Sequence, residues 1–429
     1  MRTFQEKLTN GFYALISLPS TAMGFALSIQ ISALSWLLTT KYHLDIHQVG
    51  FVWAAGPLAG IVGQVVIGLI SDKVWFWGGR RRPFILIGGT LASLMLLALP
   101  NIEMVDRALG LGNLLAVAIA VALTLDLAIN ISFNPTRSII ADVTPEGEAR
   151  TKGYTWMQTI SGFFGVMAYV IGAVAGNYVL ISVGVGVVFV CSVFPVLFVT
   201  EQRELRSTAT AGSGVRPASV TRWNELFRIY LAHGLSWIGV QTMFVYIIAF
   251  IQQKMLAGTD AATAAQDSGR IIAISFAVLN TVGFLLPAPV LEPLAMRFGR
   301  VKVHLTALAV MALGYFGIAG GGESPLLMYV LMGVVGIGWA SIVSLPFAIM
   351  TEKVDKSRMG FFMGIFNLSV VLPQLFVSLV LGTVIQQAAD KSVIFLISGI
   401  ALALSAVTWL LVREPDAGTK SATAAGGVQ

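Results

Sequence analysis

The sequence predicts an all-α membrane protein in which twelve transmembrane helices form two bundles of six. Three observations lead to this prediction. Of the 429 residues, 56% are hydrophobic and only 11% are charged, whereas soluble proteins carry about 25% charged residues. The hydrophobic residues form blocks close to the ~20 residues that a helix needs to cross a bilayer. A charged pattern in an early loop also recurs in a later loop, which indicates two related halves.

The apolar blocks define the expected helices in chain order. They lie near residues 11–39, 48–71, 83–100, 113–141, 153–175, 178–199, 229–256, 268–291, 303–321, 325–350, 358–386 and 391–412. The first block is longer than the apolar region of a cleaved signal peptide, which has about 7 to 15 residues. We therefore expect this block to be the first membrane helix.

The longest polar stretch inside the chain follows the sixth block and divides the protein into domains. It is rich in Ser, Thr, Ala and Gly, a composition typical of linkers. We expect an N-terminal six-helix bundle over residues 1–200, a cytoplasmic linker over 201–228 and a C-terminal bundle over 229–412. The small, polar residues 413–429 predict a disordered cytoplasmic tail.

The distribution of Lys and Arg predicts the orientation in the membrane. If the N-terminus is inside, the inside segments carry 21 Lys and Arg residues and the outside loops carry only Lys41, Arg107, Lys254 and Lys391. Cytoplasmic loops are enriched in positive charge. Both termini are therefore expected in the cytoplasm, and the expected location is a bacterial inner membrane.

The internal repeat lies in two equivalent loops. Asp72, Gly79 and Arg80 follow the second block, and Glu292, Gly299 and Arg300 follow the eighth, each displaced by 220 residues. Two six-helix halves related as parallel repeats suit a carrier that works by alternating access, because rocking the halves exposes a central site to each side in turn.

Composition excludes several other classes of protein. Cys191 is the single cysteine, so an internal disulfide and a multi-cysteine metal site cannot form. The net charge of +6 and the pI of about 9.5 come from loop residues that set orientation, so we expect no nucleic-acid partner. We expect the bilayer as surroundings, a monomer, no metal and no cofactor.

Asp126 is the acidic residue that lies well inside an apolar block. A carboxylate near the bilayer centre is costly, so it normally faces a bundle interior or a wet cavity and marks an ion or proton path. Arg137 follows eleven residues later, which brings it to the same helix face about 16 Å further along the axis. Asn130 shares this face, and Pro135 removes a backbone hydrogen bond nearby. We therefore expect Asp126 to couple protons and the whole face to line a central cavity.

Other polar side chains occur in the middle of apolar blocks. Amides offer a donor and an acceptor together, and an aromatic face can cover the apolar side of a sugar ring. Interhelical hydrogen bonds could also explain any single one of these side chains. Together they predict a binding site for an uncharged polar solute, formed by Gln30, Gln64, Trp237, Gln241, Asn367 and Gln374.

Histidines and glycines give no sign of an enzyme. His43, His47, His233 and His304 are expected near the membrane interfaces, and none has the spacing of a metal site. No phosphate-binding loop and no Ser, His and Asp set is present in the sequence. We therefore expect no enzymatic activity.

Three segments resemble a known family. Residues 56–72 (GPLAGIVGQVVIGLISD) with 79–85 (GRRRPFI), 125–142 (LDLAIN and NPTRSIIAD) and 364–379 (GIFNLSVVLPQLFVSL) are similar to the sucrose-proton symporters of plants and their bacterial and animal relatives. These belong to the glycoside-pentoside-hexuronide group of the major facilitator superfamily. The resemblance implies the major facilitator fold, and it implies that Asp126 and Arg137 carry proton coupling and sugar binding. In the eighth block Asp267 and Gly269 fit the family's pattern, but Arg270 lies one residue before the position of the family's Arg.

The leading hypothesis is a proton-coupled importer of a disaccharide, sucrose or a maltose-like glycoside, with the sugar and the proton as its partners. Two alternatives remain open: a sodium-coupled glycoside symporter and a proton-driven exporter of small solutes. Sodium needs several oxygen ligands, and Asp126 is the one mid-membrane carboxylate that the sequence offers. An exporter of cations would not place the positive charge of Arg137 on the same helix face as this carboxylate.

The repeated loops also predict a cytoplasmic gate. Asp72 with Arg80, and Glu292 with Arg300, could form ion pairs that close the inner side while the cavity faces outward.

Overall fold

Helices joined by turns and short loops make up the part of the chain that the computed structural model describes, which comprises residues 7–60, 70, 74–145, 148–201, 222–321, 323–351, 353–354 and 359–413. Within these residues the N-terminal half contains α2 (Asn10–Ile29), η1 (Gln30–Leu34), α3 (Ser35–Thr40), α4 (Ile46–Trp53), α6 (Arg82–Ala98), η2 (Leu99–Asn101), α7 (Ile102–Leu109), α8 (Leu114–Val143), α9 (Glu148–Ala175) and α10 (Asn177–Phe198).

The C-terminal half begins with the longest helix, α11 (Trp223–Lys254). It continues with α12 (Ala261–Leu285), η3 (Pro287–Leu291), α13 (Glu292–Phe298), α14 (Arg300–Gly321), α15 (Pro325–Ile342), α16 (Leu345–Thr351), α17 (Met359–Phe376), η5 (Val377–Leu381), α18 (Gly382–Gln387) and α19 (Val393–Trp409). Several predicted membrane helices are thus interrupted by a short π-helix or a short break.

Polar side chains define where several helices begin. Asn113 caps α8 by accepting a hydrogen bond from the backbone N–H of Ala116, and Asp260 caps α12 through Ala262 and Thr263. The cap at Asp260 explains why α12 begins at Ala261 and not near residue 268, where the apolar block begins. Hydropathy locates the buried part of a membrane helix, whereas the caps decide its length.

Ten helices in the described chain are long and apolar enough to cross a membrane, and α19 is a shorter apolar helix. The second of the twelve predicted helices, 48–71, is described over 48–60 and at 70, and its residues 61–69 and 71 lie outside the described residues. Side chains such as Val179, Val190 and Leu197 of α10 are exposed, as expected for a surface that faces lipid tails. Together with the comparisons given below, this supports the twelve-helix plan.

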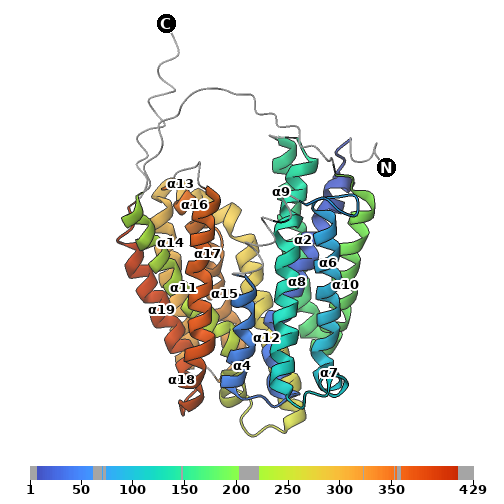
Figure 1. The fold of residues 1–429 in the computed structure, drawn as a ribbon. Helices are drawn as coiled ribbons and strands as arrows, with labels where there is room; N and C mark the ends of the chain where they lie inside the picture. The colour runs from blue at the N-terminus through green and yellow to red at the C-terminus, as the bar shows by residue number, and fades with distance from the viewer. Residues whose placement is uncertain are drawn as a thin grey trace.

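The helices form two groups, one from each half of the chain (Figure 1). In the first, α2 packs against α9 and α10, and α6 packs against α8; in the second, α11 and α14 pack against α19. The ribbons of the two groups diverge towards the end that carries both termini (Figure 1).

The two halves contact each other at the end opposite the termini. Ser35 donates a hydrogen bond to the Val245 carbonyl at 2.9 Å, and Trp36 donates to the Ala265 carbonyl. His47 of α4 contacts Gln386 through its backbone N–H and Thr383 through its ring. This end is therefore closed by contacts between the halves.

The predicted boundaries of the linker need a correction. Residues 223–228 were expected in the linker, but they form the first turns of α11. Glu225 holds this start in place, because its carboxylate contacts Lys353 at 3.4 Å and accepts from the backbone N–H of Arg413 at 3.1 Å. Residues 202–221 of the linker and 414–429 of the tail lie outside the described residues.

Candidate functional site

Asp126 lies in the middle of α8 and is buried, with 6% of its surface exposed. Gln30 is the first residue of the short π-helix η1 and is 4% exposed. It donates a hydrogen bond from Nε2 to Asp126 Oδ2 at 3.0 Å. Gly56 completes this environment, because a Cβ atom there would lie 3.1 Å from Asp126 Oδ2. The carboxyl group thus lies between three predicted membrane helices, within reach of an amide from the first.

Asn130 and Arg137 continue along α8 towards the side of the termini. Asn130 donates to the backbone carbonyl of Asp126 at 2.8 Å. Arg137 is exposed, and its guanidinium lies 4.1 Å from the centroid of the Phe133 ring. No carboxylate pairs with Arg137 within the described residues. Asp126 and Arg137 therefore share a helix face without touching each other.

The predicted polar residues of the C-terminal half form two separate contacts. Gln374 donates to Gln241 at 3.2 Å, which joins α17 to α11. Trp237 donates its indole N–H to His233 at 3.1 Å and lies edge-on to Trp339, with ring centroids 6.0 Å apart. Asn367 is half-buried. In the described chain no hydrogen bond joins these residues to Asp126.

A cavity of about 240 Å³ lies between the halves, at mid-height of the helices that surround it. Its walls come from α2, α9, α12 and α15, and they contain both small residues and polar or aromatic side chains. The polar and aromatic side chains are Ser28, Ser161, Tyr169, Asn280 and Trp339. A larger cavity of about 340 Å³ lies at the end opposite the termini, lined by aliphatic residues of α4 and α11 together with Tyr246, Gln252, Gln253 and Lys391. The smaller cavity suits a polar ligand with an apolar face, because it combines hydroxyl and amide groups with the Trp339 indole.

The sequence pattern does not single out these cavity residues. Serines and tyrosines are common in apolar helices and give no signal against that background, whereas Trp339 is a mid-block indole like Trp237. Asn280 could have been found, because it is a mid-block amide like Gln241. Its amide donates to the Phe276 carbonyl at 2.9 Å.

The histidines differ from their expected positions. His233 and His304 were expected at the interfaces, but both are buried. His233 stacks on Phe366 at 4.7 Å, and His304 contacts Ser341 at 2.6 Å. An imidazole can replace its water contacts by such partners, so an interfacial location does not follow from polarity alone.

The predicted gate residues have other partners in this structure. Arg80 contacts Asp142 at 2.9 Å, and Arg81 contacts the same carboxylate at 3.2 Å. The carboxylate of Glu201 accepts hydrogen bonds from the backbone N–H groups of Arg80, Arg81 and Arg82 at 2.7–3.0 Å. Glu201 thereby caps the start of α6. Asp72, and the predicted binding residue Gln64, lie outside the described residues.

The predicted gate contact of Glu292 and Arg300 stays a prediction, because it was expected while the cavity faces outward and this structure is closed at the end opposite the termini. Glu292 is exposed and makes no ion pair within the described residues. Glu292 is the first residue of α13, which ends at Phe298, and Arg300 begins α14 after the non-helical Gly299.

Comparison with known proteins places this arrangement in a family. The Major Facilitator Superfamily sequence model matches residues 17–286 and 242–428. Sucrose transport protein SUC4 of Arabidopsis thaliana is 24% identical over 385 residues, covering 76% of this chain and 75% of the relative. General alpha-glucoside permease of Schizosaccharomyces pombe is 26% identical over 174 residues, covering 36% of this chain and 31% of the permease.

Solved structures share the fold. The nucleoside transporter NupG superposes with a TM-score of 0.72 at 12% identity, covering 94% of this chain and 99% of that chain. The xylose transporter XylE from E. coli, in its inward open conformation, gives a TM-score of 0.66 at 15% identity and covers 95% of this chain and 97% of that chain. The chain thus has the helical fold of these membrane transporters, its relatives are transporters and not enzymes, and it belongs to the Major Facilitator Superfamily.

Proposed function

We propose that this protein imports a glycoside of disaccharide size together with a proton, by alternating access. The observation that carries the proposal is the Asp126 carboxyl group, buried in the middle of a membrane helix and hydrogen-bonded to Gln30. A buried acid of this kind is expected on a proton path. The names of the relatives, a sucrose transport protein and an alpha-glucoside permease, support a sugar as the substrate.

The arrangement of the halves suits one state of the transport cycle. Contacts join the halves at the end opposite the termini, and the helices diverge towards the termini (Figure 1). With the termini in the cytoplasm, as the charge bias predicts, this state is closed outside and open inside. Arg137 is exposed and lies about 16 Å from Asp126 along α8, so it would favour the ionised carboxylate and proton release only in a state of the cycle that brings the two groups closer.

The cavity between the halves offers contacts that suit a sugar. The Trp339 indole would cover an apolar ring face, and Asn280, Ser161 and Tyr169 would meet hydroxyl groups. These groups come from both halves, so a bound sugar contacts both at once. Such a ligand can shift the equilibrium between the inward-open and outward-open states only if it makes different contacts in each state.

Uptake into proteoliposomes tests the role of Asp126. An Asp126→Asn variant cannot carry the proton, so an inward pH gradient should no longer drive uphill accumulation of labelled sucrose or maltose. Exchange of sugar without net proton movement should continue, because the amide keeps the size of the side chain. A matched control is Glu103→Gln, which removes an exposed acid of α7.

Normal uphill accumulation by Asp126→Asn would overturn the proposal. A wild-type protein that accumulates sugar on a sodium gradient at constant pH, and not on a pH gradient, would contradict proton coupling in favour of sodium. Medium alkalinisation during inward sugar movement is the expected result for import.

A further inference from the structure

A tight turn before α6 holds an indole out of the protein. Phe76 and Gly79 exchange two backbone hydrogen bonds of 3.1 Å, so Trp77 and Gly78 occupy the tip. Both tip residues have positive φ, 47° for Trp77 and 74° for Gly78. Turns of this kind favour Asn, Asp or Gly, because other residues with positive φ are strained. Trp77 is 69% exposed all the same, so neither local preference nor burial explains an indole at this position.

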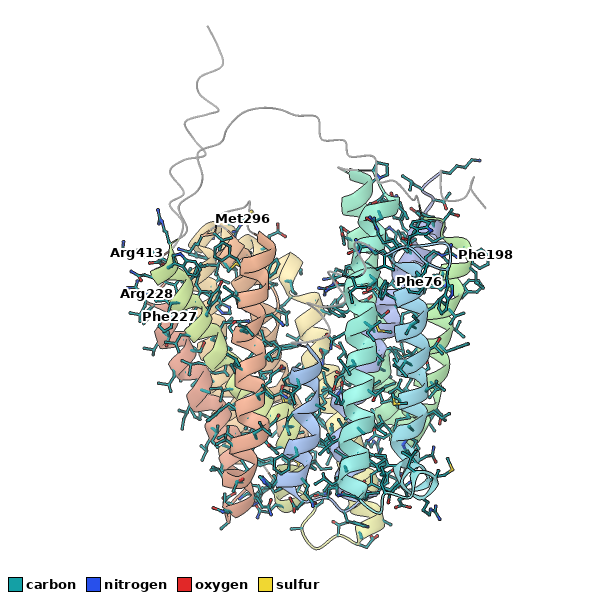
Figure 2. The ribbon with its side chains drawn as sticks, in the orientation of Figure 1. Phe76, Phe198, Phe227, Arg228, Met296 and Arg413 are labelled. Carbon is teal, nitrogen blue, oxygen red and sulfur yellow. The ribbon has the colours of Figure 1, made fainter. Side chains whose placement is uncertain are left out.

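The turn lies where the membrane surface is expected. The candidate span of α6 begins at Arg82, five residues after Trp77, and the span of α10 ends at Phe198. Figure 2 shows Phe76 and Phe198 near the same end of the N-terminal half. Phe76 packs between Trp77 at 5.4 Å and Phe84 at 5.6 Å, which anchors the indole to the body of the protein. Tryptophan prefers the headgroup level of a bilayer, because its ring is apolar and its N–H is polar.

The same corner carries a positive charge that no carboxylate neutralises within the described residues. Arg80 and Arg81 contact Asp142, and Glu201 caps the backbone. Arg82 folds back onto the turn, where its Nη1 lies 3.4 Å from the Gly78 carbonyl. No carboxylate pairs with Arg82 in the described part of the chain. A guanidinium in this position suits a phosphate group, with which it can form two parallel hydrogen bonds.

The other half provides a contrast at the same end of the molecule. Phe227 and Arg228 lie together at the edge of the C-terminal half (Figure 2). Arg228 contacts Glu225 at 3.3 Å and donates to the Leu411 carbonyl at 2.9 Å, so its charge is compensated. Trp223 packs on Phe362 with ring centroids 5.6 Å apart. An exposed aromatic ring next to a basic residue thus occurs in both halves. Arg228 has a carboxylate partner, whereas Arg82 has none within the described residues.

We propose that Trp77 and Arg82 form a binding site for an anionic phospholipid, in the leaflet on the side of the termini. The indole would lie among the headgroups and the guanidinium would bind the lipid phosphate. An anionic lipid at this position would hold the turn next to the Arg80–Asp142 and Arg81–Asp142 contacts. The site does not depend on which solute the protein transports.

Native mass spectrometry of the full-length protein tests the site, with phosphatidylglycerol and phosphatidylcholine titrated separately. We expect phosphatidylglycerol to bind more tightly. Arg82→Gln should weaken this binding about fivefold, to the level of phosphatidylcholine, whereas the control Arg228→Gln should leave it unchanged. Equal losses in both variants would overturn the proposal in favour of general attraction to a basic surface. Displacement of the lipid by inorganic phosphate would overturn it in favour of a soluble anion.

The indole is tested by Trp77→Asn, because Asn adopts positive φ easily and the turn should form at least as well. We expect the melting temperature without lipid to be unchanged or higher, and the binding of both lipids to be weaker. The control Trp223→Asn should not change lipid binding. Unchanged lipid binding by a folded Trp77→Asn variant would contradict the role of the indole.

Discussion

At the scale of single residues, the hydrogen bond between Gln30 and Asp126 carries the most specific expectation. A hydrogen bond to a charged group contributes about 1.5 to 3 kcal/mol. We therefore predict that Gln30→Leu lowers the kcat/KM of proton-driven sugar uptake about 10- to 100-fold. The measurement is the initial uptake rate in proteoliposomes over a range of sugar concentrations.

The control for this prediction is the same change in a protein that already lacks the acid. In Asp126→Asn, which exchanges sugar without the proton, Gln30→Leu should change the exchange rate much less. An equal loss in both backgrounds would show that Gln30 acts independently of Asp126. Non-additivity is expected for two side chains in direct contact.

The residue scale also shows which site residues sequence reasoning can find. A carboxylate within an apolar block is costly, so Asp126 stands out. Tyr169 does not stand out, because aromatic residues are ordinary in membrane helices. Gln241 and Gln374 were predicted to bind the solute, and the structure pairs them with each other at 3.2 Å. Their role in binding stays a prediction.

At the scale of helices, the contact of α4 with η5 and α18 closes the end opposite the termini. A Cβ atom at Gly50 would lie 2.3 Å from the Ser378 carbonyl oxygen and 2.7 Å from the Tyr246 hydroxyl. Tyr246 cannot move freely, because it donates to the Val377 carbonyl at 3.1 Å. Overpacking of this kind costs about 1 to 3 kcal/mol. We predict that Gly50→Ala disfavours closure of this end and shifts the protein towards the opposite arrangement.

Spin-label distances test this shift. With Cys191 replaced by serine, labels at the exposed residues Leu111 and Thr259 report on the two halves at this end. Gly50→Ala should lengthen the distance between them. Gly186→Ala is the control, because its added Cβ would have no atom within 4 Å. An unchanged distance in Gly50→Ala would show that the contact does not decide closure.

At the scale of the whole molecule, the pH dependence of transport should come from the buried acid and not from surface ion pairs. Asp390 lies near the outer end, 3.0 Å from Lys254. Its pKa is lowered to about 2 by the hydrogen bond from the Ser392 backbone and by Lys254. Because its pKa is lowered, the ionised Asp390 stabilises the folded protein. This stabilisation is complete above the ordinary pKa of an aspartate, near 3.9, and is lost only as the pH falls towards 2.

Asp390 is therefore ionised throughout the range from about pH 5 to 8. We predict that Asp390→Asn leaves the midpoint of the pH profile of sugar uptake unchanged, whereas Asp126→Asn removes the dependence on the proton gradient. The measurement is the uptake rate at a series of external pH values. A shifted midpoint in Asp390→Asn would contradict this assignment.

The sequence alone determined the helical membrane class and the division into halves, and it placed Asp126 and Arg137 on one helix face. These properties are local: hydropathy depends on neighbouring residues, and the helical period relates residues a few turns apart. The tertiary structure decided which side chains meet. Asp126 lies 96 residues from Gln30 in the chain, Arg80 contacts Asp142 across 62 residues, and four helices from both halves line the cavity. These contacts depend on how the helices pack against one another, which the pattern along a single helix does not contain.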